Sequence, residues 1–101
     1  MSNVFRFPRG DWTDTERLEL VRLEEFCAQR YILECSHTDE GDPWCVVFLR
    51  GQHEILLHIA KLDHGYVAVA PQEHRSLRTS RLSDAIRFGL AALQRTAERT
   101  V

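Results

Sequence analysis

The sequence lacks the features that mark several protein classes. It has no run of the roughly 18 apolar residues that a membrane-spanning helix needs, and its first residues lack the apolar core of a signal peptide. It has only three cysteines, Cys27, Cys35 and Cys45, and their spacing matches no disulfide framework. This usage predicts reduced thiols. We therefore expect a soluble chain that stays in the cytoplasm.

Catalytic motifs are also missing. No glycine-rich phosphate loop is present, and no nucleophile elbow or oxyanion loop accompanies any cysteine. The five histidines lie in or beside the region of the predicted strands. None of the cysteines has the sequence context of a known cysteine nucleophile. These absences predict a protein that is not an enzyme and that carries no cofactor.

What is present is typical of one globular domain. The chain has 101 residues, 44% of them apolar and 28% charged, and shows no internal repeat or linker. We therefore expect a single domain over residues 1–101. Residues 1–11 form an N-terminal arm, in which Phe5 and Phe7 alternate with Arg6 before Pro8 and Gly10 end it.

Helical periodicity occurs at both ends of the domain. Thr13 and Glu16 have the spacing of a capping box and predict a helix over residues 14–30. A second helix is predicted to begin at Thr79 or Ser80 and to end near residue 97. The apolar stripes are Leu18, Val21, Leu23, Phe26 and Cys27 in the first helix and Leu82, Ala85, Ile86, Gly89, Leu90, Leu93 and Ala97 in the second.

Between the helices the pattern changes to strands. Short apolar segments over residues 31–35, 44–50, 53–62 and 66–70 are separated by turns too short to join anything except antiparallel neighbours. Residues 72–80 are predicted to be a polar, basic connection. The predicted fold is α+β: a helix, an antiparallel meander of three to four strands and a helix.

The strands are apolar on both faces. In the second predicted strand, Trp44, Val46 and Phe48 lie on one face, and the alternate residues are apolar as well. Two helices on one face would leave the other bare, and a bare apolar face is typical of an interface. We expect Trp44, Val46 and Phe48, with Phe5 and Phe7, to bind a partner, although the arm or a helix could instead cover this face.

Charge is unevenly distributed along the chain. Residues 31–73 carry two basic and seven acidic residues, whereas residues 74–101 carry six arginines and two acidic residues. Such a division can orient two proteins, including two copies of one chain. The leading hypothesis is therefore a protein–protein interaction or regulatory module that forms a homodimer through its sheet.

Nucleic-acid binding is an alternative. Arg75, Arg78 and Arg81 precede the last helix, and cations at that place contact phosphates in double-stranded-RNA-binding domains, which share an order of helix, three strands and helix. The chain is net acidic, however, and contains one lysine. The arginines would otherwise pair with Asp39, Glu40 or Asp42 of this or another subunit.

A metal or redox site is a second alternative. Cys35, His37 and Cys45 carry ligand atoms suited to Zn²⁺ and would meet across the turn between the first two strands. They lack the close cysteine or histidine pairs of most zinc sites. Asp39, Glu40 and Asp42 lack the spacing of a calcium loop and are typical of a turn.

The segment from Asp39 to Trp44, with the sequence DEGDPW, carries a resemblance. Together with the helix start at residues 14–16 and residues 58–60 and 63–67, it is similar to a small domain of bacterial, chiefly alphaproteobacterial, proteins. The resemblance covers residues 4–70. That family has no assigned activity, so the resemblance implies no function.

Overall fold

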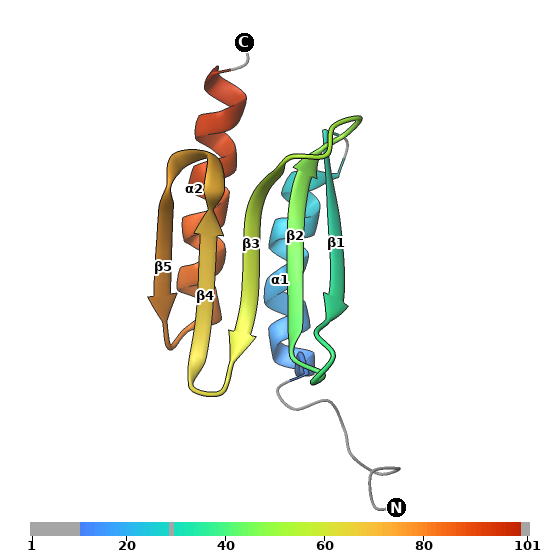
Figure 1. Cartoon of the computed structure of the whole chain (residues 1–101), viewed down its shortest axis with the longest axis vertical. Helices are drawn as coiled ribbons and strands as arrows, with labels where there is room; N and C mark the ends of the chain where they lie inside the picture. Colours follow the sequence, from blue (N-terminus) through green and yellow to red (C-terminus); the bar gives the residue numbers. More distant parts are fainter. Residues whose placement is uncertain (1–10, 29, 100–101) are drawn as a thin grey trace, which may run out of the picture.

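The computed structural model describes residues 11–28 and 30–99 and places two helices around one sheet (Figure 1). The strands form an antiparallel meander in the order β1-β2-β3-β4-β5. The predicted α+β architecture is therefore confirmed, with one strand more than expected. The elements are α1 (Asp14–Cys27), β1 (Tyr31–His37), β2 (Pro43–Leu49), β3 (Ile55–Leu62), β4 (Gly65–Ala70), the 3-10 turn η2 (Pro71–Glu73), β5 (Arg75–Thr79) and α2 (Leu82–Arg99).

The additional strand, β5, corrects the prediction of a polar connection over residues 72–80. The turn η2 and His74, whose φ of 54° lies in the left-handed region, reverse the chain after β4. β5 then pairs with β4 along its whole length. As an edge strand it carries exposed Arg75 and Arg78 beside the half-buried Leu77. Charged residues are common on edge strands, so its sequence resembles that of a loop.

Helix α1 begins as predicted but turns a different face to the core. Thr13 caps it, with both hydrogen bonds of the capping box to Glu16 present. The buried residues are Glu16, Leu20, Leu23 and Cys27, spaced by four, three and four residues. Three members of the predicted stripe are exposed instead: Leu18, Val21 and Phe26.

Both helices pack on the same face of the sheet, where the core lies. Figure 1 shows the strands in front with α1 and α2 behind them. Gly89 of α2 lies directly against Leu57 of β3, so close that a Cβ at this position would clash with the leucine side chain. Of the described residues, no helix is long and apolar enough to span a membrane. The core includes Leu23, Val47, Leu57, Ile59, Ala68, Ile86 and Leu93.

The register of β1 and β2 determines the state of two cysteines. Cys35 lies directly opposite Cys45, with their Cα atoms 4.1 Å apart, and the two sulfurs form a disulfide. Cys35 is exposed and Cys45 is buried. Cys35 and Cys45 meet across the turn as the strand pattern predicted, but they form a disulfide and are not the reduced thiols that the cysteine count led us to expect.

We expect the disulfide to stabilise the fold by limiting the unfolded chain. It joins residues ten positions apart, and a loop of that length predicts that reduction lowers the free energy of unfolding by about 2–3 kcal/mol. Urea unfolding with and without a phosphine reductant measures this difference. A Cys35→Ser variant is the control, because it should not respond to the reductant. Equal stability of the oxidised and reduced wild-type protein would contradict the prediction.

Candidate functional site

The face of the sheet turned away from both helices is apolar across its three central strands. The register aligns Val46 with His58 and His58 with Val69, so these side chains form one row on this outer face. Val46 is buried, and the other apolar side chains of β2, β3 and β4 on this face are half-buried. We call the following residues the apolar stripe: Trp44, Val46, Phe48, Leu62, Val67 and Val69.

The predicted partner-binding residues of β2 therefore share one surface. Trp44, Val46 and Phe48 all lie in the apolar stripe, and no element formed by residues 11–28 or 30–99 covers the side of the sheet seen in Figure 1. Phe5 and Phe7 lie outside the described residues. The sequence prediction missed the contribution of β4, although the alternation of Val67 and Val69 was visible in its short segment.

His58 keeps this face uncharged near neutral pH. Its ring meets that of Trp44 edge-on, with ring centroids 6.0 Å apart. Burial lowers the pKa of His58 from its usual value of 6.5, because an apolar environment disfavours the imidazolium form. The ring is therefore mainly neutral at pH 7 and adds to the apolar surface.

Opposite charges border the apolar stripe. Glu34 lies on the edge strand β1, and its pairing with Val46 places it on the outer face. Arg78 lies on the opposite edge strand, β5, and its pairing with Val67 places it on the same face. Both residues are exposed. Neither side chain makes a hydrogen bond or salt bridge to another described residue, so both charges are available to a partner.

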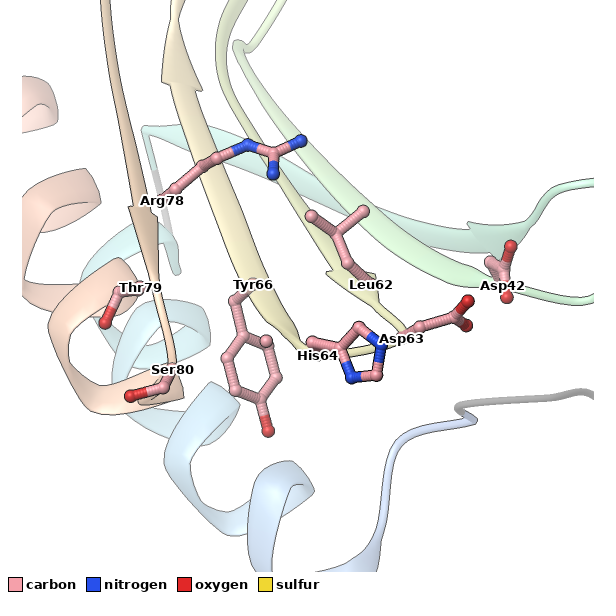
Figure 2. Close-up of a pocket in the computed structure, with 9 residues that line it drawn as sticks. Asp42, Leu62, Asp63, His64, Tyr66, Arg78, Thr79 and Ser80 are labelled. Atoms are coloured by element: carbon pink, nitrogen blue, oxygen red, sulfur yellow. The ribbon is translucent and has the colours of Figure 1, made fainter.

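A cavity of about 560 Å³ hollows the corner of this face beside the turn between β3 and β4 (Figure 2). Figure 2 shows the side chain of Arg78 extending from β5 across β4, on the same side as Leu62. Asp42 lies on the far side of the cavity, beyond Asp63. Leu62 and Arg78 connect the cavity to the outer face, whereas Tyr66, which also lines it, reaches Glu16 of α1 on the other face. The cavity therefore lies at the end of the sheet, with Arg78 and Asp42 among its walls.

The arginines of the nucleic-acid alternative lie on or just after β5. Arg75 and Arg78 belong to the strand, and Arg81 follows it before α2. None pairs with Asp39, Glu40 or Asp42 within the described chain, and pairing with these residues of another subunit stays a prediction. Five strands separate the two helices, so the order of elements departs from that of the double-stranded-RNA-binding domain on which the analogy depends.

The residues of the metal alternative have other partners. Cys35 and Cys45 are bonded to each other, and Nε2 of His37 lies 3.0 Å from a carboxylate oxygen of Asp11. Within the described part of the chain, no three histidine, cysteine or acidic side chains are grouped to hold a metal ion. The remaining thiol, Cys27, is buried, and burial raises its pKa to about 11. Such a thiol is a poor nucleophile at neutral pH.

A buried polar cluster links α1 to the sheet and was not predicted. Glu16 accepts hydrogen bonds from the backbone N–H of Thr13, from Nζ of Lys61 at 2.8 Å and from the hydroxyl of Tyr66. Burial acts to raise the pKa of Glu16, but these hydrogen bonds outweigh it and keep the pKa below its usual value. Burial and the bond to Glu16 raise the pKa of Tyr66 to about 12. These groups stabilise the layers by binding one another.

Removal of the Glu16 carboxylate should destabilise the protein strongly. A Glu16→Ala variant leaves the ammonium of Lys61, whose side chain is 16% exposed, without its partner. Breaking a buried ion pair in this way costs about 3–5 kcal/mol. Urea unfolding measures the loss, with exposed Glu25→Ala of the same helix as the control. A loss no larger than that of the control would show that the cluster contributes little.

A second ion-pair cluster holds η2 against α2. Glu73 accepts hydrogen bonds from Nε and Nη2 of Arg95 and from Nη1 of Arg99. The bond from Arg95 is the main cause that lowers the pKa of Glu73 to about 2. A group with a depressed pKa stabilises the fold above its unfolded-state pKa, and this stabilisation is lost as the pH falls toward its folded-state pKa.

We therefore expect acid to weaken the wild-type protein more than a Glu73→Gln variant. The difference should develop between about pH 4.5 and about pH 2, where wild-type Glu73 must take up a proton on unfolding. Urea unfolding at several pH values tests this. Glu54→Gln, in the exposed turn before β3, is the control and should follow the wild type. Parallel pH curves for Glu73→Gln and the wild type would contradict the prediction.

Comparison with known proteins identified no family model, curated protein or solved structure that matches the chain. The resemblance carried by the DEGDPW segment to an alphaproteobacterial domain therefore stays a prediction.

Proposed function

We propose that this chain is a non-enzymatic protein-interaction module that associates with a second copy of itself through the outer face of its sheet. The observation that carries the proposal is the apolar stripe. It spans three strands of six to eight residues, which corresponds to about 300 Å² of sheet by the usual strand spacing and rise. The largest apolar patch of a single chain is commonly about 300–600 Å² and is often a functional surface.

The composition of the face supports association with another protein. It combines the aromatic side chains of Trp44 and Phe48 with aliphatic ones. Its centre carries little charge at neutral pH because the pKa of His58 is lowered. Aromatic residues in an apolar centre with charges at the border are typical of protein interfaces. Glu34 and Arg78 provide this border.

A second copy is favoured over an unrelated protein by the two signs of charge on the border. A surface that is acidic on one side and basic on the other is complementary to itself when one copy is rotated by half a turn. Three described groups with shifted pKa values are engaged within the fold. Glu16 and Tyr66 bind each other, and Cys27 is buried.

The proposal predicts a dimer that depends on the apolar stripe. At about 50 µM the wild-type protein should sediment as a dimer, within the range of modest interfaces. Val69 is half-buried on β4 in the middle of the outer face, and Val69→Lys places a positive charge there. Burying that unpaired charge should raise the dissociation constant roughly 100-fold or more. Sedimentation equilibrium measures both.

The matched control is Leu18→Lys, because Leu18 is a 72% exposed apolar residue on α1, in the other layer of the fold. Its dimer should be as stable as that of the wild type. Phe48→Glu is a second variant of the apolar stripe, and circular dichroism shows that each variant is folded. A monomeric wild type, or a dimer that Leu18→Lys dissociates and Val69→Lys does not, would overturn the proposal.

A further inference from the structure

The charged residues at the two borders of the outer face bear on the orientation in which a second copy binds. The acidic border consists of Glu34 on β1 and of Asp39 and Glu40 in the turn that follows it. The basic border consists of Arg78, which its pairing with Val67 places on the outer face, and of Arg81 in the connection from β5 to α2. All five residues are exposed, and none of their side chains has a hydrogen bond or salt bridge to a residue of 11–28 or 30–99.

The topology places both borders at the same end of the sheet. In a five-stranded antiparallel meander, β1 and β5 run in the same direction. The turn after β1 and the residues after β5 therefore lie at the same end, on opposite sides of the sheet, as Figure 1 shows. The outer face is thus acidic at one corner and basic at the neighbouring corner, with the apolar stripe between the two sides.

Two symmetric arrangements bring two such faces together with aligned strands. A twofold axis perpendicular to the strands places β1 over β1 and β5 over β5 with their ends reversed. The turns after β1 then lie at opposite ends, but Glu34 and Arg78 lie in adjacent middle rows of the sheet, so Glu34 comes near Glu34 and Arg78 near Arg78. A twofold axis parallel to the strands places β1 of each copy over β5 of the other, so that opposite charges meet. Both arrangements bury the same apolar stripe. Charge therefore favours the second arrangement, because Glu34 and Arg78 then meet opposite charges, whereas like charges brought together across an interface oppose association.

We infer that two copies of this chain pair face to face about a twofold axis parallel to the strands, with the acidic border of each copy over the basic border of the other. The inference rests on the proposed self-association and adds its geometry. Arg78 shares a row across the sheet with Ser36. Glu34 lies two residues along β1, about 7 Å away by the rise of a strand. Arg78 thus comes within reach of Glu34 of the second copy.

The cavity beside the turn between β3 and β4 fits the same arrangement. Arg78 extends over it in Figure 2, and it opens on the outer face beside Leu62. The axis parallel to the strands brings the turn that contains Asp39 and Glu40 of one copy to this corner of the other. The corner thus offers a recess and an unpaired guanidinium to an acidic turn, which supports a second copy as the occupant.

Charge exchange between two variants tests this geometry. Glu34→Arg places a cation opposite Arg78 of the second copy, and Arg78→Glu places an anion opposite Glu34. Each variant alone should dimerise at least about tenfold more weakly than the wild type at low salt. An equimolar mixture of the two should form a heterodimer with wild-type affinity, because position 34 of each copy then meets the opposite charge at position 78 of the other. The double variant E34R/R78E should recover the homodimer. Native mass spectrometry and sedimentation distinguish these species.

The matched controls are Glu25→Arg and Arg22→Glu, which make the same charge changes at exposed positions of α1. They should leave the dimer unchanged. Recovery in the mixture also shows that the two border variants are folded. A heterodimer of Glu34→Arg with wild type that is tighter than the wild-type dimer would indicate an axis perpendicular to the strands and overturn the inference.

The two proposals fail in different ways. A wild-type protein that stays monomeric removes the proposed function, and the inferred geometry falls with it. A wild-type dimer that Val69→Lys dissociates, but that Glu34→Arg and Arg78→Glu leave unchanged, removes only the geometry. Raising the salt from about 50 mM to about 1 M should reduce the difference between the single variants and the wild type, because salt screens exposed charges.

Discussion

The arrangement of this domain depends on the packing of both helices against one face of a five-stranded sheet. Short turns restrict the strands to a meander, and the helices enter and leave at its two edges. The close contact of Gly89 with Leu57 brings α2 against the middle strand, while Leu23 of α1 is fully buried in the same core. Because both helices occupy this face, the apolar residues on the opposite side of the sheet point away from the core.

Buried polar groups hold the two layers together with specific partners. Glu16 connects the start of α1 to Lys61 on β3 and to Tyr66 on β4. A carboxylate at this depth needs such partners, since an unpaired buried charge is costly. The cluster explains why α1 turns its Glu16 side inward and leaves Leu18 exposed. It also uses the single lysine of the chain within the fold.

The outer face and the inner face differ in how completely their apolar side chains are buried. Inner-face residues such as Ile59 and Ala68 are fully buried by the helices. Outer-face residues such as Phe48 and Val67 keep part of their apolar surface exposed, bordered by charges without partners in the described chain. Burial of the inner face by the helices therefore stabilises the fold. Association with a second copy would bury the apolar surface that the outer face leaves exposed.

Much of the candidate site followed from local pattern. Alternation in the segment around Trp44, Val46 and Phe48 placed three side chains on one face, and pairing confirms that they share it. The acidic turn and the basic residues near position 78 were visible as charge along the chain. Their positions on the two sides of one face were not visible, because that relation depends on β5. The half-buried residues of β5 are Leu77 and Thr79, and because only Leu77 is apolar, the sequence shows no clear apolar alternation.

Local sequence by itself determined the types of most elements, the capping box of α1 and the antiparallel meander, because helical period, strand alternation and turn length act over a few residues. Tertiary structure alone decided three further features. It paired β5 with β4, turned Glu16 inward and joined Cys35 to Cys45 in a disulfide. Each depends on contacts between residues distant in sequence or on the register across a turn, which single-residue preferences do not specify. The same register unites the apolar stripe with borders of opposite charge.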